Sequence, residues 1–246
     1  MITLVDADFM MLQEVGSLAT LRETNADLEQ PYPFVGLIPG NSNRSIHLGV
    51  LSRFKTRLQS HKETPLHDRQ GRAMEVYASE EDAISHKRTI ARMQRDVLRA
   101  SFTWQGRRVA VFGVHLKSAW NPAWMEIGTD VLREAEARCV TRIVNDYRDE
   151  HPDDFVALVG DFNDAASSDA LKPIRQLKFV DVHHEWFQNQ GRNPTTYWPR
   201  RRSRIDRIYL SPETAELVTE GSQVIHAGEM AKQASDHYPV SVELNF

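Results

Sequence analysis

Short apolar runs recur along the whole chain, each bounded by polar or turn-forming residues. Runs of about four to eight residues, alternating or continuous, are typical of β-strands. The pattern predicts strands at Asp8–Glu14, Phe34–Ile38, Ile46–Ser52, Val97–Trp104, Arg108–Val114, Phe155–Val159, Val180–Val182, Ile205–Leu210, Gln223–Ile225 and Tyr238–Leu244. Gln105-Gly106 separates two of these runs, which indicates a β-hairpin.

Other segments have helical spacing. Apolar residues recur every three or four positions over Glu126–Tyr147, which predicts a long amphipathic helix. Gly16–Leu28 predicts a second helix, ended by the prolines that follow. The stretch Lys55–Val97 is polar and weakly periodic; we expect a helix at Glu81–Met93 and a substrate-facing loop around it.

Many short strands with few long helices favour an α/β fold with two stacked, mostly antiparallel sheets flanked by helices. Strand signals run throughout the 246 residues without a linker or repeat, so we expect one domain covering 1–246, and a monomer. No apolar run approaches the about 18 residues of a transmembrane helix, and no signal-peptide pattern is visible. Localisation stays open, with the cytoplasm as the default.

The formal net charge of −4 disfavours a dedicated, tight DNA binder, because such proteins usually have a basic surface. Basic residues cluster locally, however, at Arg200–Arg202 with Arg204 and between His86 and Arg108. Such clusters are either solvated loops or phosphate contacts at the rim of a site. The single cysteine, Cys139, cannot form an internal disulfide and is expected in the core.

Polar groups gather where the predicted strands end. Gly160-Asp161-Phe162-Asn163 follows one strand, and His115-Leu116-Lys117-Ser118 follows another. Glu14 ends the first strand, and Ser235-Asp236-His237 precedes the last one. Hard cations and phosphoryl chemistry use oxygen-bearing side chains at such places. Glu14 is the best candidate metal ligand; its alternative role is to complement the dipole of the helix that follows.

Asp206 and Arg95 belong to two further candidate motifs. Asp206 stands within a predicted strand beside Ile205 and Ile208. A carboxylate there is unfavourable unless it is paired, so it either orients a histidine, with His115 the expected partner, or bridges to an arginine. Arg95 precedes Asp96 and offers a fork of N–H donors suited to phosphate.

The order of these motifs resembles that of the endonuclease/exonuclease/phosphatase superfamily, the deoxyribonuclease I-like phosphoesterases. Arg204-Ile205-Asp206-Arg207-Ile208 is similar to the family's Arg-Ile-Asp strand, and Arg95-Asp96 to a step about 20 residues before its His motif. The resemblance covers the chain from about Asp8 to Leu244. It implies a four-layered α/β sandwich and a metal-dependent phosphodiesterase using Mg²⁺ or Mn²⁺.

The resemblance also implies roles. Asp161 would activate or orient the attacking water, while His115 would donate to phosphate or act as the acid. Asp236 would support the metal or pair with the adjacent His237, raising its basicity. Asn163 would donate to a phosphate oxygen or hold the nucleophile. The predicted catalytic residues are Asp161, His237, His115, Asn163, Asp236 and Asp206; the phosphate-binding residues are Arg95, Asn163 and His115; the metal ligands are Glu14 and Asp236.

One departure from the family concerns the beginning of the chain. In the family a strand carrying a metal-binding Asn and then a helix precede the Glu14 position, whereas this chain offers only residues 1–7 there. We expect these residues to be the last turn or two of that helix, with the first strand missing.

The substrate is expected to be nucleic acid, since His-Leu-Lys-Ser is most similar to the nuclease branch. Trp120, Trp124 and Thr196-Tyr197-Trp198 could stack bases or cap a substrate rim, or simply pack. Alternatives are an inositol-phosphate or phospholipid phosphodiesterase, resembling a sphingomyelinase, and a catalytically impaired binding relative that lacks the first-strand Asn.

Overall fold

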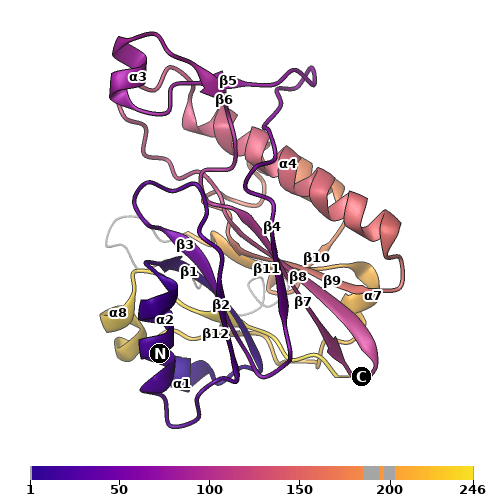
Figure 1. Cartoon of the computed structure of the whole chain (residues 1–246). Helices are drawn as coiled ribbons and strands as arrows, with labels where there is room; N and C mark the ends of the chain where they lie inside the picture. Colours follow the sequence, from indigo (N-terminus) through magenta and orange to yellow (C-terminus); the bar gives the residue numbers. More distant parts are fainter. Residues whose placement is uncertain (1, 185–193, 197–202, 246) are drawn as a thin grey trace.

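The computed structural model describes residues 2–184, 194–196 and 203–245 (Figure 1). Its helices are α1 (Ile2–Val5), α2 (Leu18–Ala26), α3 (Glu80–Ile84), α4 (Thr129–Glu150), the 3₁₀ turn η1 (Asp169–Leu171), α5 (Lys172–Gln176), α7 (Pro212–Ala215) and α8 (Glu229–Ala234). Its strands are β1 (Phe9–Val15), β2 (Phe34–Leu37), β3 (His47–Ser52), β4 (Arg57–Ser60), β5 (Glu75–Val76), β6 (Thr89–Ile90), β7 (Val97–Trp104), β8 (Arg107–His115), β9 (Phe155–Asp161), β10 (Val180–Asp181), β11 (Asp206–Leu210), β12 (Val224–Ile225) and β13 (Val240–Ser241).

The largest sheet has six strands in the order β10-β11-β9-β8-β7-β4. All its neighbours are antiparallel except β8 and β9, which run parallel. A parallel pair needs a long crossover connection, and α4 supplies it. As a result β8 and β9 end at the same edge of the sheet, and β11 begins there.

A second layer of strands packs on one face of this sheet. It consists of the antiparallel sheet β1-β3-β2 and the separate pair β12-β13. Alternate residues of β1 point to opposite sides: Phe9 and Met11 contact the six-stranded sheet, whereas Met10 and Leu12 pack toward Leu21 of α2. The outer helix α2 therefore covers the smaller sheet.

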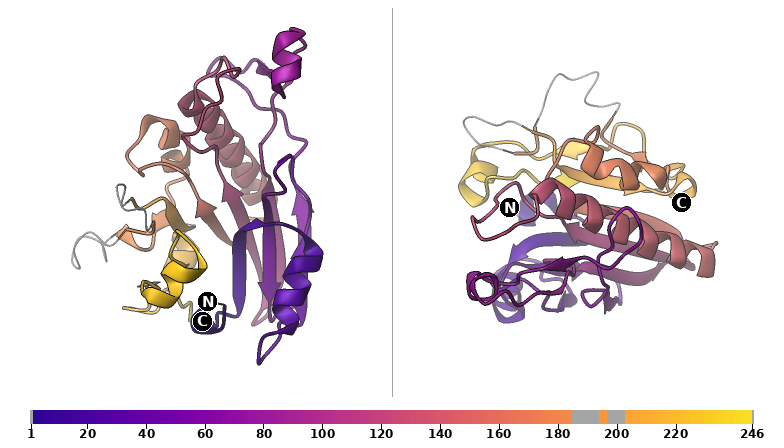
Figure 2. Two further views of the ribbon diagram at one scale, coloured as in Figure 1. Left: turned by 90° about the vertical axis from the view of Figure 1, so that its left-hand side faces the viewer. Right: turned by 90° about the horizontal axis from the view of Figure 1, so that it is seen from above.

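Helix α4 covers the opposite face of the six-stranded sheet. Its apolar stripe, including Leu132, Cys139 and Val140, joins Phe112 of β8 and Leu158 of β9 in the largest core cluster. Figure 2 shows α2 and α4 on opposite sides of the strands. The order helix, sheet, sheet, helix confirms the predicted α/β sandwich, and the buried Cys139 confirms the predicted core thiol.

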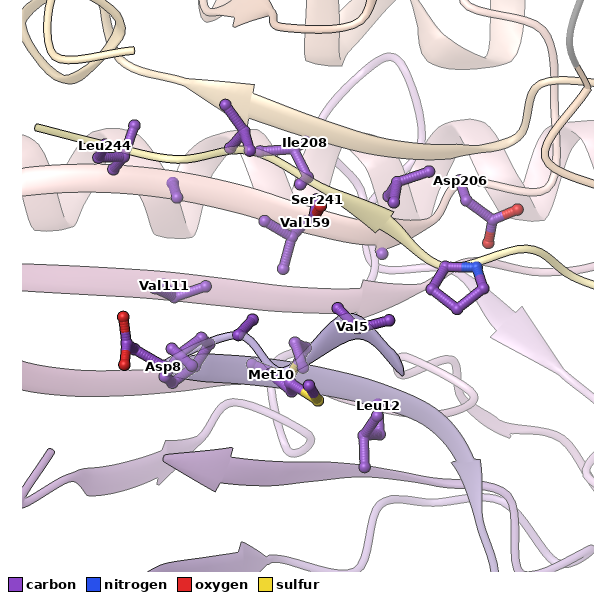
Figure 3. Close-up of a pocket in the computed structure, with 18 of the residues that line it drawn as sticks. Val5, Asp8, Met10, Leu12, Val111, Val159, Asp206, Ile208, Ser241 and Leu244 are labelled. Atoms are coloured by element: carbon purple, nitrogen blue, oxygen red, sulfur yellow. The ribbon is translucent and has the colours of Figure 1, made fainter. Parts of the chain in front are cut away.

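A groove separates β1 from the C-terminal strands (Figure 3). It has a volume of about 690 Å³, and its walls include Met10 and Leu12 on one side and Ser241 and Leu244 on the other. Asp206 and His237 are also among the residues that line this groove. In the described residues β1 is an edge strand, paired only with β3. The expectation of a missing first strand stays a prediction.

The polar stretch 55–97 departs most from its prediction. The helix expected at Glu81–Met93 is wrong: α3 spans Glu80–Ile84, and the chain then turns at His86 with φ of 53°. Strand β4 was not predicted, because it is a short strand at the sheet edge in which Leu58 is the single apolar residue among Arg57, Gln59 and Ser60. The hairpin β5-β6 with α3 forms an arm, residues 61–96, that extends away from the sheets (Figure 1).

The elements leave no candidate for a membrane span. In the part of the chain that the structure describes, no helix is both long and apolar enough to cross a bilayer.

Candidate active site

Three adjacent strand ends bring the predicted acidic and histidine residues together. His115 at the end of β8 is in register with Asp161 at the end of β9, and Asp161 with Asp206 at the start of β11. His115 Nε2 lies 3.5 Å from Asp161 Oδ2. All three residues are buried. Residues far apart in sequence thus form one row across the ends of three neighbouring strands.

Gly160 allows this row to form. Its φ of 135° is in the region that side chains rarely adopt, and an added Cβ would lie 2.0 Å from the carbonyl oxygen of Val114. A side chain at this position would push β9 away from β8 directly before Asp161.

His237 approaches the row from the C-terminal segment. Its Nδ1 lies 2.9 Å from Asp206 Oδ2 and 3.0 Å from Oδ1. The expectation that Asp206 orients a histidine is confirmed, but the histidine is His237 and not His115. The hydrogen bond of His237 Nδ1 goes to Asp206, so the predicted pairing of His237 with Asp236 is wrong. Neighbouring residues in an extended segment point to opposite sides, and Asp236 is exposed to solvent.

Thr195, which sequence analysis did not single out, holds the two segments of this pair. Its buried hydroxyl accepts hydrogen bonds from the backbone N–H groups of Ile205 and Asp206, both 3.1 Å. Its carbonyl accepts from the Tyr238 N–H at 2.7 Å. One threonine therefore fixes the backbone next to Asp206 and next to His237.

Asp161 and His237 both have raised pKa values. Burial, reinforced by the nearby Asp206 carboxylate, raises the pKa of Asp161 to about 7. Burial opposes the charged form of His237, but the hydrogen bond to Asp206 and the charges of Asp206 and Asp161 outweigh it and raise the pKa of His237 to about 9. At neutral pH His237 is therefore a cation that is hydrogen-bonded to Asp206.

His115 has the opposite character. Burial, together with the positive charges of Arg95 and His237, lowers its pKa to about 3. His115 is therefore neutral and suited to hydrogen bonding. Its Nδ1 is buried with no hydrogen-bond partner in the structure as described.

Asn163 and Arg95 both bind the chain just after His115. Asn163 turns back with φ of 52°, and its side-chain amide donates to Asp161 Oδ2 at 3.0 Å and to the Leu116 carbonyl at 2.9 Å. Both amide hydrogens are thus engaged, which favours holding Asp161 over donating to phosphate. Arg95 is buried rather than a surface residue, and it donates to the same Leu116 carbonyl at 3.4 Å.

One group of described residues could share a metal ion. Ligand atoms of Asp161, Asp206 and His237 all lie within 4.8 Å of one another. Carboxylate oxygens suit Mg²⁺ or Mn²⁺. A cation would also relieve the repulsion from Asp206, which adds to burial in raising the pKa of Asp161. The predicted ligands Glu14 and Asp236 are both exposed and lie outside this group. Glu14 has φ of 58°, where the register of β1 with β3 shifts.

The predicted rim is described only in part. Trp120 is 66% exposed after β8, and its carbonyl accepts a hydrogen bond from Lys117 Nζ. Arg204 forms an ion pair with Asp181 at 2.8 Å, which leaves its charge partly neutralised. Tyr197, Trp198 and the cluster Arg200–Arg202 lie outside the described residues.

Residues 1–237 match the model of the Endonuclease/Exonuclease/phosphatase family. The chain belongs to this family. No curated protein sequence gives a significant match. The family places the chain among phosphoesterases, hydrolases that include nucleases and phosphatases.

Similar solved structures share the fold at low identity. A D. rerio TDP2 complexed with single-strand DNA product is 19% identical with a TM-score of 0.61, covering 100% of this chain and 88% of that one. The 3′ phosphatase NExo (D146N) from Neisseria, bound to a product DNA hairpin, is 16% identical with a TM-score of 0.60, covering 97% and 89%. An AP endonuclease from Archaeoglobus fulgidus is 15% identical with a TM-score of 0.57, covering 100% and 91%.

Proposed function

We propose that this protein is a divalent-metal-dependent phosphodiester hydrolase that cleaves nucleic acid by in-line attack of an activated water. The observation that carries the proposal is the meeting of Asp161, the Asp206–His237 pair and neutral His115 at one sheet edge. Phosphodiester hydrolysis needs an oriented water, neutralised phosphate charge and a stabilised leaving oxygen, and these groups offer all three.

Asp161 is the group proposed to orient and deprotonate the water. A general base must lie within hydrogen-bond reach of the proton that it accepts, and Asp161 stands at the centre of the row formed by His115, Asp161 and Asp206. The Asn163 backbone N–H and side-chain amide hold its two oxygens at 2.7 and 3.0 Å. The carboxylate therefore has one fixed orientation before substrate binds.

His237 is proposed to face the phosphate. Because Nδ1 points at Asp206, Nε2 is the nitrogen left to donate to a phosphate oxygen. The protonated His237 can also pass its Nε2 proton to the leaving oxygen. His115 and Arg95 lie on the other side of Asp161 and are proposed to position the phosphate, with Arg95 adding positive charge.

The ion is proposed to be Mg²⁺ or Mn²⁺, held by Asp161 and Asp206 with His237 beside them. When bound, it would neutralise phosphate charge and polarise the P–O bond. Glu14 and Asp236 remain predicted ligands outside the described cluster.

Nucleic acid is the favoured substrate, because two of the similar structures were solved with DNA products. The test is cleavage of an end-labelled single-stranded DNA at moderate salt with Mg²⁺, with Mn²⁺ and with EDTA. Sphingomyelin vesicles and an inositol phosphate serve as competitors. We expect metal-dependent DNA cleavage that neither competitor suppresses. Hydrolysis of a competitor in preference to DNA would replace the substrate; DNA binding without cleavage would support the impaired binding relative.

A further inference from the structure

The turn of α4 that carries Arg133 and Glu136 contacts Gln94 and Lys117, which lie close in sequence to Arg95 and His115, the residues proposed to bind phosphate. We propose that Glu136 is a positioning residue: its carboxylate fixes the spacing between the segment of Arg95 and the segment that follows His115. The inference rests on the proposed function and adds a residue that does not touch substrate.

The carboxylate of Glu136 bridges two backbone groups. Its Oε1 accepts from the Gln94 N–H at 3.1 Å, and its Oε2 accepts from the Lys117 N–H at 2.6 Å. Gln94 is adjacent to Arg95, and Lys117 is two residues after His115. One side chain thus joins two segments that are distant in sequence.

Arg133, one turn earlier on the same face of α4, completes the grip on Lys117. Its guanidinium donates to the Lys117 carbonyl at 2.7 Å and forms an ion pair with Asp164 at 3.0 Å. Asp164 follows Asn163, which in turn binds Leu116. Both backbone groups of Lys117 are therefore held by one helical turn, and so is the end of the Asp161 loop.

A buried carboxylate at this position has a purpose other than packing. Glu136 is 1% exposed, and burial raises its pKa, opposed by the hydrogen bonds from Gln94 and Lys117 and by nearby positive charge. An apolar residue would fill the helix–sheet core at lower electrostatic cost. What an apolar residue cannot do is accept two backbone N–H groups and so set the distance between their segments.

The effect should fall on phosphate binding rather than on proton transfer. Glu136 reaches the segments of Arg95 and His115, whereas Asp206 and His237 are held by Thr195 from a different part of the chain. Loss of the bridge would let Arg95 shift relative to His115 and Asp161, which the pairing of β8 with β9 holds together, while the Asp206–His237 pair keeps its geometry.

The experiment compares Glu136→Gln and Glu136→Ala with Glu134→Gln. Glu134 lies on the same turn but pairs with Arg69 and Arg138, which makes it the matched control. Three quantities are measured: the dissociation constant of inorganic phosphate in the presence of Mg²⁺, kcat and KM on bis(p-nitrophenyl) phosphate, and amide hydrogen exchange at Gln94 and Lys117.

We expect Glu136→Ala to weaken phosphate binding and raise KM by about tenfold, which corresponds to about 1.4 kcal/mol, with kcat within about threefold. Glu136→Gln, which keeps one acceptor oxygen, should recover part of the loss. Glu134→Gln should match wild type. Exchange at Lys117 should quicken only in the Glu136 variants.

Unchanged phosphate affinity in Glu136→Gln and Glu136→Ala, or a fall in kcat at constant KM, would overturn the positioning role. If wild type binds phosphate but hydrolyses nothing, the proposed function fails and the phosphate and exchange measurements still decide the role of Glu136. If Glu136→Ala does not fold, the isosteric Glu136→Gln carries the comparison.

Discussion

At the residue scale, Gly160 is the position where a single methyl group decides the geometry. A Cβ there would meet the Val114 carbonyl at 2.0 Å with φ of 135°, so Gly160→Ala should lower the free energy of unfolding by about 3 kcal/mol or more. Urea unfolding measures this. Gly16→Ala is the control, because nothing lies within 4 Å of its Cβ; an equal loss in both variants would rule out the close approach as the cause.

A second residue-scale prediction concerns the Asp206–His237 pair. Asp206→Asn and His237→Gln should each lower kcat by at least about 10²-fold, because the pair acts as one unit. The double variant should then be little slower than either single variant. Steady-state hydrolysis of a phosphodiester measures all three; fully multiplicative losses would show that the two side chains act independently.

Residue by residue, the sequence predicted that Asp161, Asp206 and His237 meet but not how they pair, and its predicted metal ligands Glu14 and Asp236 lie outside their cluster. Asp161, Asn163 and His115 were found because polar groups at the ends of apolar strands share a sheet edge. The partner of His237 could not be predicted, because Thr195, far away in sequence, sets its approach. Glu136 gave no signal either, since a glutamate on an amphipathic helix usually faces solvent.

At the scale of elements, strongly periodic segments were predicted correctly, whereas segments at the edge of the sheet were not. The hairpin Val97–Trp104 with Arg107–His115 and the helix Thr129–Glu150 lie within a few residues of their predictions, because their apolar positions face a core. Strand β4 has no buried apolar residue, and the buried apolar residues of the arm, such as Leu66, Met74 and Met93, are separated by polar stretches. Tertiary pairing rather than periodicity therefore determines both.

The root of the arm provides an element-scale prediction. Asp96 is buried and accepts from the His61 N–H at 2.9 Å, and burial raises its pKa from 3.8 to about 6. The folded state therefore binds its proton more tightly than the unfolded state does. The resulting stability is present below pH 4 and is lost as the pH rises through about 6.

Asp96→Asn removes this dependence while keeping the oxygen that accepts from His61. Relative to wild type, the variant should gain about 2–3 kcal/mol of unfolding free energy between pH 4 and pH 7.5, at about 1.36 kcal/mol per pKa unit. Urea unfolding at both pH values measures the change. A stability difference that is the same at both would contradict the raised pKa.

At the scale of the whole molecule, the six-stranded sheet and the smaller layer of strands meet over an apolar core, while a groove stays open beside β1. Asp206 lies at one end of this groove (Figure 3), and His237 is among its lining residues. The sandwich and the family were predictable because six short motifs fall in the family's order. The division of the smaller layer into β1-β3-β2 and β12-β13 was not, because strand pairing depends on contacts between distant segments.

Metal binding tests whether Asp161 of β9 and Asp206 of β11 hold the ion together. Asp161→Asn and Asp206→Asn should each weaken Mn²⁺ binding by about tenfold or more, since even residues that only orient a ligand contribute about that much. Calorimetric titration measures this without substrate. His67→Gln, a substitution outside the cluster, should leave the affinity unchanged. A loss in Glu14→Gln as large as in Asp161→Asn would add Glu14 to the ligands.

The most direct measurement of the central claim is hydrolysis of bis(p-nitrophenyl) phosphate by wild type and by Asp161→Asn, with Mg²⁺ or Mn²⁺ and with EDTA. We predict metal-dependent turnover that EDTA abolishes and that Asp161→Asn lowers by at least about 10²-fold, with both proteins equally folded by circular dichroism. Turnover that persists in EDTA, or that Asp161→Asn leaves unchanged, would contradict a metal-dependent phosphodiesterase centred on Asp161.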